Sequence, residues 1–114
     1  MTSARLPTVW VCGPPGVGKT TVGWELFSQL TRAGVRAGYV DIDQLGICYP
    51  EPASDPGRHR LKVRNLDPIA VNFRAAGAEC LIVSGVVDPE HGVHVDQLPH
   101  AALMMCRLRL DREE

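Results

Sequence analysis

The sequence lacks an excess of charge of either sign. Its 114 residues include 12 basic and 13 acidic ones, which gives a net charge of −1. A cationic surface for duplex nucleic acid or for an anionic membrane is therefore not expected. Long apolar runs are also missing, so neither a membrane-spanning helix nor a secretory leader is predicted. These absences favour a cytoplasmic protein whose partner is a small solute.

Cysteines are few, and their spacing does not fit the common cysteine-based sites. The four cysteines stand at positions 12, 48, 80 and 106, without a paired C-x-x-C motif. This spacing matches neither a zinc ribbon nor a dense disulfide framework. Cys12, Cys80 and Cys106 lie within apolar runs. We therefore expect reduced thiols that pack as small hydrophobic side chains.

Apolar residues make up 45% of the sequence, which is enough for one globular core. Short apolar runs predict four strands, at residues 8–12, 37–43, 79–87 and 102–110. Helical spacing of apolar residues predicts helices over 19–33 and 58–77, and the segments 46–57 and 88–100 read as loops. Strands that alternate with helices predict a three-layer α/β domain with a mostly parallel sheet.

Pro68 interrupts the second predicted helix. Proline removes a backbone donor and clashes with the preceding turn, so a kink or break is predicted at residues 67–68. In the alternative arrangement Asp67 caps a second helix, with Pro68 in its first turn.

A glycine-rich loop follows the first predicted strand. The segment GPPGVGKTT satisfies the pattern G-x-x-x-x-G-K-[ST] between a predicted strand and a predicted helix. In such a loop, backbone N–H groups and the helix N-terminus bind phosphate oxygens. Lys19 is predicted to contact the β- and γ-phosphates of ATP, and Thr20 to ligate Mg²⁺. The predicted nucleotide-binding residues are Gly13, Pro15, Gly16, Val17, Gly18, Lys19, Thr20 and Thr21.

Three segments carry a family resemblance. GPPGVGKTT, then YVDIDQLG, then FRAAGAECLIVSGVVDP resemble the phosphate-loop small-molecule kinases. Adenylylsulfate kinase has the most similar layout, and shikimate and gluconate kinases are more distant. The resemblance covers roughly residues 8–110, but only the phosphate loop is a specific motif. It implies a sheet with strand order 2-3-1-4 and transfer of the γ-phosphoryl group of ATP to a small-molecule hydroxyl.

Two aspartates, Asp41 and Asp43, end the second predicted strand. Alternate residues of a strand point to the same face, so both carboxylates are expected to reach a common site. The resemblance implies that this site lies beside the γ-phosphate. Asp43 is predicted to be catalytic together with Lys19, and Asp41 to bind the metal or Thr20. A solvated strand end is the alternative.

The second predicted helix carries candidates for binding the acceptor. The resemblance implies an arginine and an asparagine there, and Arg60, Arg64 and Asn65 are the candidates in this sequence. A solvated helix face is the alternative. Adenylylsulfate kinases also carry an arginine three residues after the second acid, where this sequence has Gly46. The acceptor is therefore expected to differ from adenylylsulfate.

The family's arginine-rich lid and fifth strand have no counterpart in this sequence. Residues 1–114 are predicted to form a single nucleotide-binding domain, either truncated at its C-terminus or a reduced relative.

One alternative to a kinase is an NTPase or switch that hydrolyses ATP or GTP. It needs a Walker B acid after the third strand, for which only Asp88 is a candidate. The other is a truncated binding module without turnover, which self-associates through the edge of the fourth strand.

His91 and His94 form an H-x-x-H pair, with Asp88, Glu90 and Asp96 nearby. The glycine and the proline in this segment oppose the helix that would align the two imidazoles. Exposed loop residues are therefore the preferred interpretation, and a metal site is the alternative.

Overall fold

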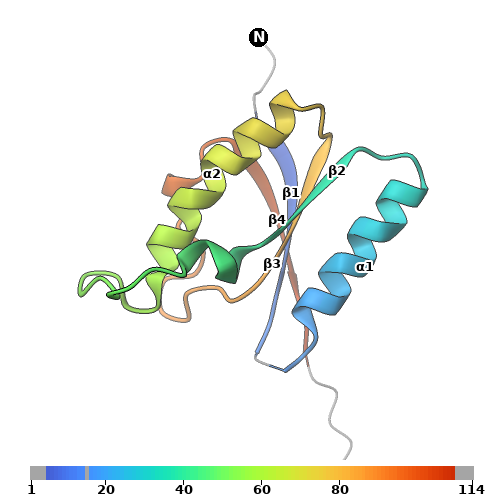
Figure 1. Ribbon diagram of the computed structural model, residues 1–114. Helices are drawn as coiled ribbons and strands as arrows, with labels where there is room; N and C mark the ends of the chain where they lie inside the picture. The colour runs from blue at the N-terminus through green and yellow to red at the C-terminus, as the bar shows by residue number, and fades with distance from the viewer. Residues whose placement is uncertain (1–4, 15, 110–114) are drawn as a thin grey trace, which may run out of the picture.

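The sheet has four parallel strands in the order β2-β3-β1-β4 (Figure 1). The computed structural model describes residues 5–14 and 16–109. The strands are β1 (Leu6–Cys12), β2 (Ala37–Asp41), β3 (Cys80–Ser84) and β4 (Ala101–Arg107). The order and the parallel pairing confirm the predicted fold class. Neither helix in the described ranges has the length and apolar character needed to cross a membrane.

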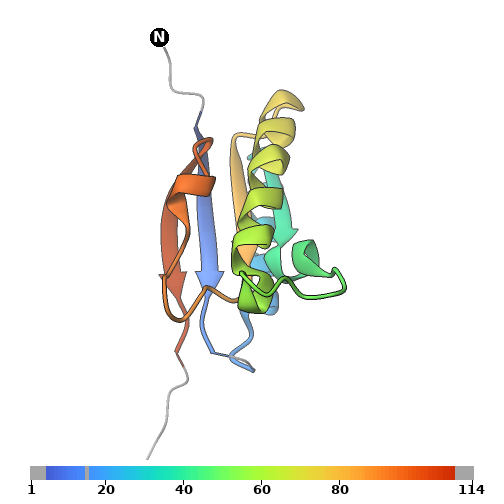
Figure 2. The same ribbon diagram turned by 90° about the vertical axis from the view of Figure 1, so that its left-hand side faces the viewer.

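One helix covers each face of the sheet (Figures 1 and 2). Helix α1 (Lys19–Arg32) packs on β1, β2 and β3, and helix α2 (His59–Ala75) lies on the opposite face. Three short 3₁₀ segments lie in the loops: η1 (Ile42–Gly46), η2 (Pro56–Arg58) and η3 (Val95–Gln97). This arrangement confirms the three predicted layers.

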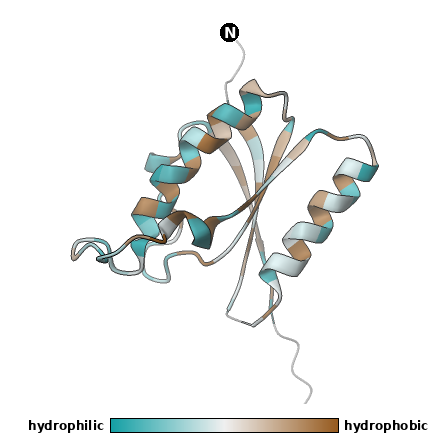
Figure 3. Ribbon diagram, in the orientation of Figure 1, coloured by the Kyte–Doolittle hydropathy of each residue, from teal (hydrophilic) through white to brown (hydrophobic). Residues whose placement is uncertain are grey.

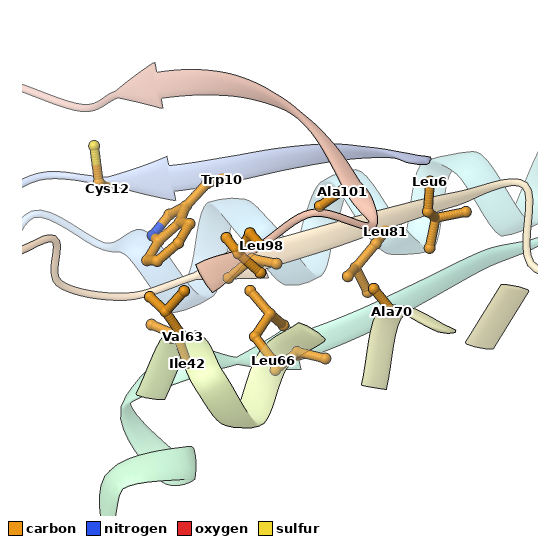
Figure 4. Close-up of a cluster of buried hydrophobic side chains, with 12 residues drawn as sticks. Leu6, Trp10, Cys12, Ile42, Val63, Leu66, Ala70, Leu81, Leu98 and Ala101 are labelled. Atoms are coloured by element: carbon orange, nitrogen blue, oxygen red, sulfur yellow. The ribbon is translucent and has the colours of Figure 1, made fainter. Parts of the chain in front are cut away.

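The hydrophobic core lies between α2 and the sheet (Figure 4). Leu66 and Ala70 of α2 are fully buried, and they belong to the same cluster as Trp10 and Leu81 of the central strands. Leu98, just after η3, belongs to the same cluster. Figure 3 shows the same pattern as hydrophobic colour on the strands and hydrophilic colour on outward parts of the helices. Burial of each large aliphatic side chain contributes about 1.5–3 kcal/mol.

Helix α2 is continuous through Pro68, so the break predicted as one of two outcomes is wrong, and the kink, the other outcome, stays a prediction. Pro68 is exposed, and inward residues on both sides of it, Val63 and Ala70, hold the helix against the sheet. Asp67 does not cap a second helix. Its carboxylate instead accepts hydrogen bonds from the backbone N–H and the Nδ1 of His100, at 3.1 and 2.8 Å. Tertiary packing therefore outweighs the local cost of the proline.

Helix α1 approaches the sheet closely at Gly23. A Cβ atom at this position would lie 3.1 Å from Cβ of Ser84 and 3.1 Å from Cε1 of Tyr39. The hydroxyls of Tyr39 and Ser84 also share a hydrogen bond of 2.6 Å. The absence of a side chain at Gly23 lets the first turns of α1 lie directly against the sheet.

The start of α2 is held by Asp55. Its carboxylate accepts hydrogen bonds from the backbone N–H groups of Arg60 and Leu61, at 3.0 and 2.9 Å. Burial alone would raise the pKa of this carboxyl, but the two N–H groups, together with nearby His59 and Arg60, lower it below 3.8. The folded state thus favours the charged form. This stabilisation is present above the ordinary pKa and is lost as the pH falls through the lowered value.

An Asp55→Ala substitution is expected to lower the free energy of unfolding by about 0.5–2 kcal/mol at neutral pH, as for a lost helix cap. The difference from the wild type should vanish in acid, because protonation of Asp55 has the same effect as its removal. Urea unfolding over a series of pH values measures this, with Ser54→Ala as the control. A loss of stability that does not depend on pH would contradict the role given to the charge.

Candidate phosphate-loop site

The phosphate loop joins β1 to α1, and its shape depends on glycine. The φ angles of Gly13, Gly16 and Gly18 are 152°, 80° and 92°. Residues other than glycine rarely adopt such angles. At Gly13 a Cβ atom would also lie 2.7 Å from the backbone oxygen of Leu108 and 3.0 Å from Cγ1 of Val17. Glycine at this position therefore allows both the turn and the close approach of the chain that follows β4.

The first turn of α1 opens toward this loop. Gly18 precedes the helix without a side-chain cap, and the first turn contains no acidic residue. The N-terminal N–H groups and their partial positive charge are thus available to an anion. Thr20 and Thr21 are exposed in the same turn. Pro15, the predicted loop contact between these glycines, lies outside the described residues.

Lys19 folds back over the loop. Its Nζ atom donates a hydrogen bond of 3.1 Å to the backbone oxygen of Pro14, at an exposed position. This bond holds the ammonium group at the loop. A phosphate oxygen makes a stronger, fully charged hydrogen bond with an ammonium group than a neutral carbonyl does. The side chain can therefore exchange this partner for a bound phosphate.

Strand β2 ends at Asp41, two residues earlier than predicted. The Asp41 carboxylate accepts a hydrogen bond of 3.1 Å from the backbone N–H of Asp43 and so caps η1. The predicted strand over residues 37–43 is too long, because this cap turns the chain into a 3₁₀ segment. Strand alternation therefore does not set the direction of Asp43. No hydrogen bond joins Asp41 to Thr20 within the described residues.

Asp43 is anchored through one of its two oxygens. Its Oδ1 atom accepts hydrogen bonds from Nζ of Lys62 at 3.1 Å and from the backbone N–H of Val86 at 3.4 Å. The Lys62 side chain is only 13% exposed, whereas that of Asp43 is 41% exposed. Oδ2 has no hydrogen-bond partner in the described part of the chain. The result is a fixed carboxylate with one oxygen open to a ligand.

Gly46 makes room for Lys62. A Cβ atom at Gly46 would lie 2.8 and 2.9 Å from Cγ and Cε of the lysine, so its aliphatic stem occupies the space beside the glycine. Lys62 is not among the site residues predicted from the sequence, and its contact with Asp43 was missed. The available signal was spacing, because Lys62, Leu66 and Ala70 lie on one inward face at intervals of four residues.

A cleft of about 370 Å³ lies beside Asp43, and Lys62 and Arg58 contribute the cations of its lining. Arg58 has a left-handed backbone, with φ of 59°, and its Nε donates to the backbone oxygen of Cys48 at 2.8 Å. Residues other than glycine in this conformation are strained and cluster at functional sites. Arg58 also pairs with Glu51 at 3.5 Å, as Lys62 does with Asp43 at 3.1 Å, so an anionic acceptor would compete with these two carboxylates for the cations.

The three predicted acceptor-binding residues are exposed on α2, outside the lining of this cleft. Arg60 and Arg64 line a neighbouring groove of about 450 Å³ together with Asp55. Asn65 donates a hydrogen bond of 2.6 Å from Nδ2 to the backbone oxygen of Leu45, which ties α2 to η1. Their role in acceptor binding stays a prediction.

Two solved structures have a fold similar to that of this chain. APS kinase CysC of Mycobacterium tuberculosis, in a mutant form, matches with a TM-score of 0.62 and 24% identity over 90% of this chain and 76% of its own. The fold is that of the P-loop kinases. APE1195 matches with a TM-score of 0.55 and 19% identity, over 96% of this chain and 64% of its own. No protein-family model matches the sequence, and the curated proteins include no match.

These similarities confirm the predicted adenylylsulfate kinase-like layout and the strand order 2-3-1-4. The glycine loop follows the central strand β1 and precedes α1, as the sequence predicts. Asp88 lies beyond β3, and its carboxylate is occupied by His91 and His94. Strand β3 itself, CLIVS, contains no acid that could serve as a Walker B residue.

Proposed function

We propose that residues 1–114 form one ATP-binding kinase domain that transfers the γ-phosphoryl group to a hydroxyl of a small molecule. The observation that carries the proposal is Asp43, anchored by Lys62 through one oxygen and open at the other. It stands at the carboxyl edge of the sheet, where the phosphate loop also begins. Such a carboxylate can accept the proton of an acceptor hydroxyl, which is the role that a small-molecule kinase requires.

On the nucleotide side, the loop residues bind the triphosphate. The backbone from Gly13 to Gly18 and the open first turn of α1 are suited to the phosphate oxygens. Lys19 leaves the oxygen of Pro14 and contacts the β- and γ-phosphates. Mg²⁺, when bound, neutralises charge on the phosphates, and Thr20 and Asp41 are the residues proposed to hold it.

On the acceptor side, the cleft beside Asp43 receives the hydroxyl. Oδ2 of Asp43 takes the proton of this hydroxyl while its oxygen attacks the γ-phosphorus; the bond from phosphorus to the bridging oxygen breaks, and ADP leaves. Lys62 stays paired with Asp43, and Arg58 exchanges Glu51 for negative charge on the acceptor. Arg60, Arg64 and Asn65, exposed nearby on α2, contact its more distant parts.

The experiment for this proposal follows ³²P from γ-labelled ATP to a panel of small hydroxyl compounds, half of them with a carboxylate, phosphate or sulfate group. Labelling of an anionic hydroxyl compound is expected, with less transfer to its neutral analogue. GTP as a competitor reports the base preference. Release of inorganic phosphate at the same rate with and without every acceptor would favour the NTPase instead.

A nucleotide-binding module without turnover is the second candidate, and β4 is the observation that favours it. This strand forms an edge of the sheet, and its Met104 and Met105 side chains are 66% and 43% exposed. An edge with exposed apolar groups can pair with another chain. Such a protein would act through the complex that it forms.

Self-association through β4 is expected to be weak and to be reduced by Met104→Lys, since a charge on an edge strand opposes pairing. Light scattering coupled to size exclusion, over a range of protein concentrations, measures the oligomeric state. Val71→Lys is the control, because Val71 is 40% exposed on α2 and distant from β4 in sequence. Equal self-association of the wild type and Met104→Lys would exclude this edge as the interface.

A further inference from the structure

Three side chains with metal-binding atoms converge in the segment that follows β3. Oδ2 of Asp88 lies 3.1 Å from Nδ1 of His91 and 3.0 Å from Nε2 of His94. One ligand atom from each residue falls within 4.8 Å of the other two. The turn between them, closed by a hydrogen bond of 2.9 Å from the N–H of Gly92 to the backbone oxygen of Asp88, aligns the imidazoles without a helix. The sequence argued against a metal site because no helix was expected to align the imidazoles, and this turn aligns them instead.

The spacing of these atoms suits a metal ion of zinc size. Zinc bonds to imidazole nitrogen and carboxylate oxygen are about 2.0–2.1 Å long, which separates neighbouring ligands of a tetrahedron by about 3.3 Å. The two measured separations from Asp88 are close to this value. Two imidazoles and one carboxylate are ligands that zinc and related divalent transition metals accept. Each neutral imidazole can carry its proton on the other ring nitrogen and present a lone pair to an ion.

The carboxylate is oriented in advance. Oδ1 of Asp88 accepts hydrogen bonds from the backbone N–H groups of Glu90 and His91, at 2.9 and 3.3 Å, which turns Oδ2 toward the imidazoles. A ligand whose orientation is fixed by hydrogen bonds of this kind binds a metal more tightly than a free side chain does.

The cluster is sheltered on one side and open on the other. The side chains of Asp88 and His94 are 12% and 16% exposed, while that of His91 is 66% exposed. All three line a groove of about 610 Å³ that His59 and Arg60 also line. An ion held by three protein ligands would keep a coordination position for water or an anion from this groove.

We propose that Asp88, His91 and His94 form a binding site for one divalent transition-metal ion, with Zn²⁺ as the representative ion. The site is separate from the Mg²⁺ position proposed at the phosphate loop, because it uses nitrogen ligands and other residues. A bound ion joins both ends of the turn from residue 88 to 94 and fixes one wall of the groove.

The test is calorimetric titration of the full chain, purified without a polyhistidine tag, with ZnCl₂ in the presence of a competing chelator. We expect one Zn²⁺ per chain and a rise in the midpoint of thermal unfolding. His91→Ala and His94→Gln should each weaken binding by more than about 10-fold, since the loss of a residue that only hydrogen-bonds to a metal ligand already reaches that size. His91 is exposed, so its variant should retain the fold.

Two controls make the result specific. His100→Ala removes a histidine that pairs with Asp67 in a similar way but lies outside the cluster, and it should leave zinc affinity unchanged. Cys48→Ser removes an exposed thiol that could bind zinc on its own, and it should also have no effect. Failure of the wild type to bind one ion, unchanged affinity in His91→Ala, or loss of binding in Cys48→Ser would each overturn the proposal.

Discussion

Replacing Lys19 with methionine is expected to lower kcat for phosphoryl transfer by about 10²–10³-fold, the loss typical of a removed electrostatic contact with a transition state. MgATP affinity should fall by about 10-fold or more, as for a lost charge-assisted hydrogen bond. Methionine keeps much of the aliphatic length of lysine but removes the ammonium group that now contacts Pro14. The fold should be unaffected, because this contact is at the surface.

Arg32→Met is the matched control for Lys19→Met. Arg32 lies in the last turn of the same helix, is 68% exposed and pairs only with Glu25 at 3.5 Å among the described residues. Its removal takes away one positive charge of α1 far from the loop. Calorimetric binding of MgATP to both variants makes the comparison. Similar MgATP affinities for Lys19→Met and the wild type would show that the loop does not bind the nucleotide.

Replacing Asp43 with asparagine is expected to lower kcat by about 10²–10⁴-fold, the usual contribution of a general base. MgATP affinity should stay close to that of the wild type, because the nucleotide contacts lie in the loop. Asparagine has nearly the same shape and retains an oxygen for Lys62 and Val86, so the anchoring contacts can persist. A loss confined to kcat separates a reacting group from a structural one.

Asp96→Asn is the control for Asp43→Asn, because it removes the same negative charge at a position outside the proposed site. Asp96 is an exposed aspartate of η3 that bonds to the neighbouring Gln97 at 3.1 Å. Steady-state transfer rates and far-ultraviolet circular dichroism of both variants complete the comparison. An Asp43→Asn protein that loses MgATP affinity or folded structure in proportion to kcat would show that this carboxylate supports the site without reacting.

The fold was predictable because its signals are local and strong. The run TVWVC before GPPGVGKTT, and the apolar helix after it, identify a strand, a phosphate loop and a helix from chain order alone. The parallel order β2-β3-β1-β4 then follows from the alternation of strands and helices and from the family resemblance. The ends of elements differ from the prediction, as at Asp41, where a side-chain cap competes with the strand.

The details of the site were harder to predict because they depend on contacts between distant segments. Lys62 meets Asp43 across 19 residues of sequence, and the contact requires the space left by Gly46. Pro68 was expected to kink or break α2, yet burial of the residues around it keeps the helix continuous. The convergence of Asp88, His91 and His94 arises from a turn that periodicity does not describe.

The most direct test measures MgATP affinity and phosphoryl transfer on the same preparations of the wild type and of Asp43→Asn. Both proteins should bind MgATP with similar affinity, and only the wild type should transfer the γ-phosphoryl label efficiently to the acceptor found in the panel. Tight binding of MgATP by the wild type, with no labelled acceptor and no difference between the two proteins, would contradict a kinase and leave a nucleotide-binding module.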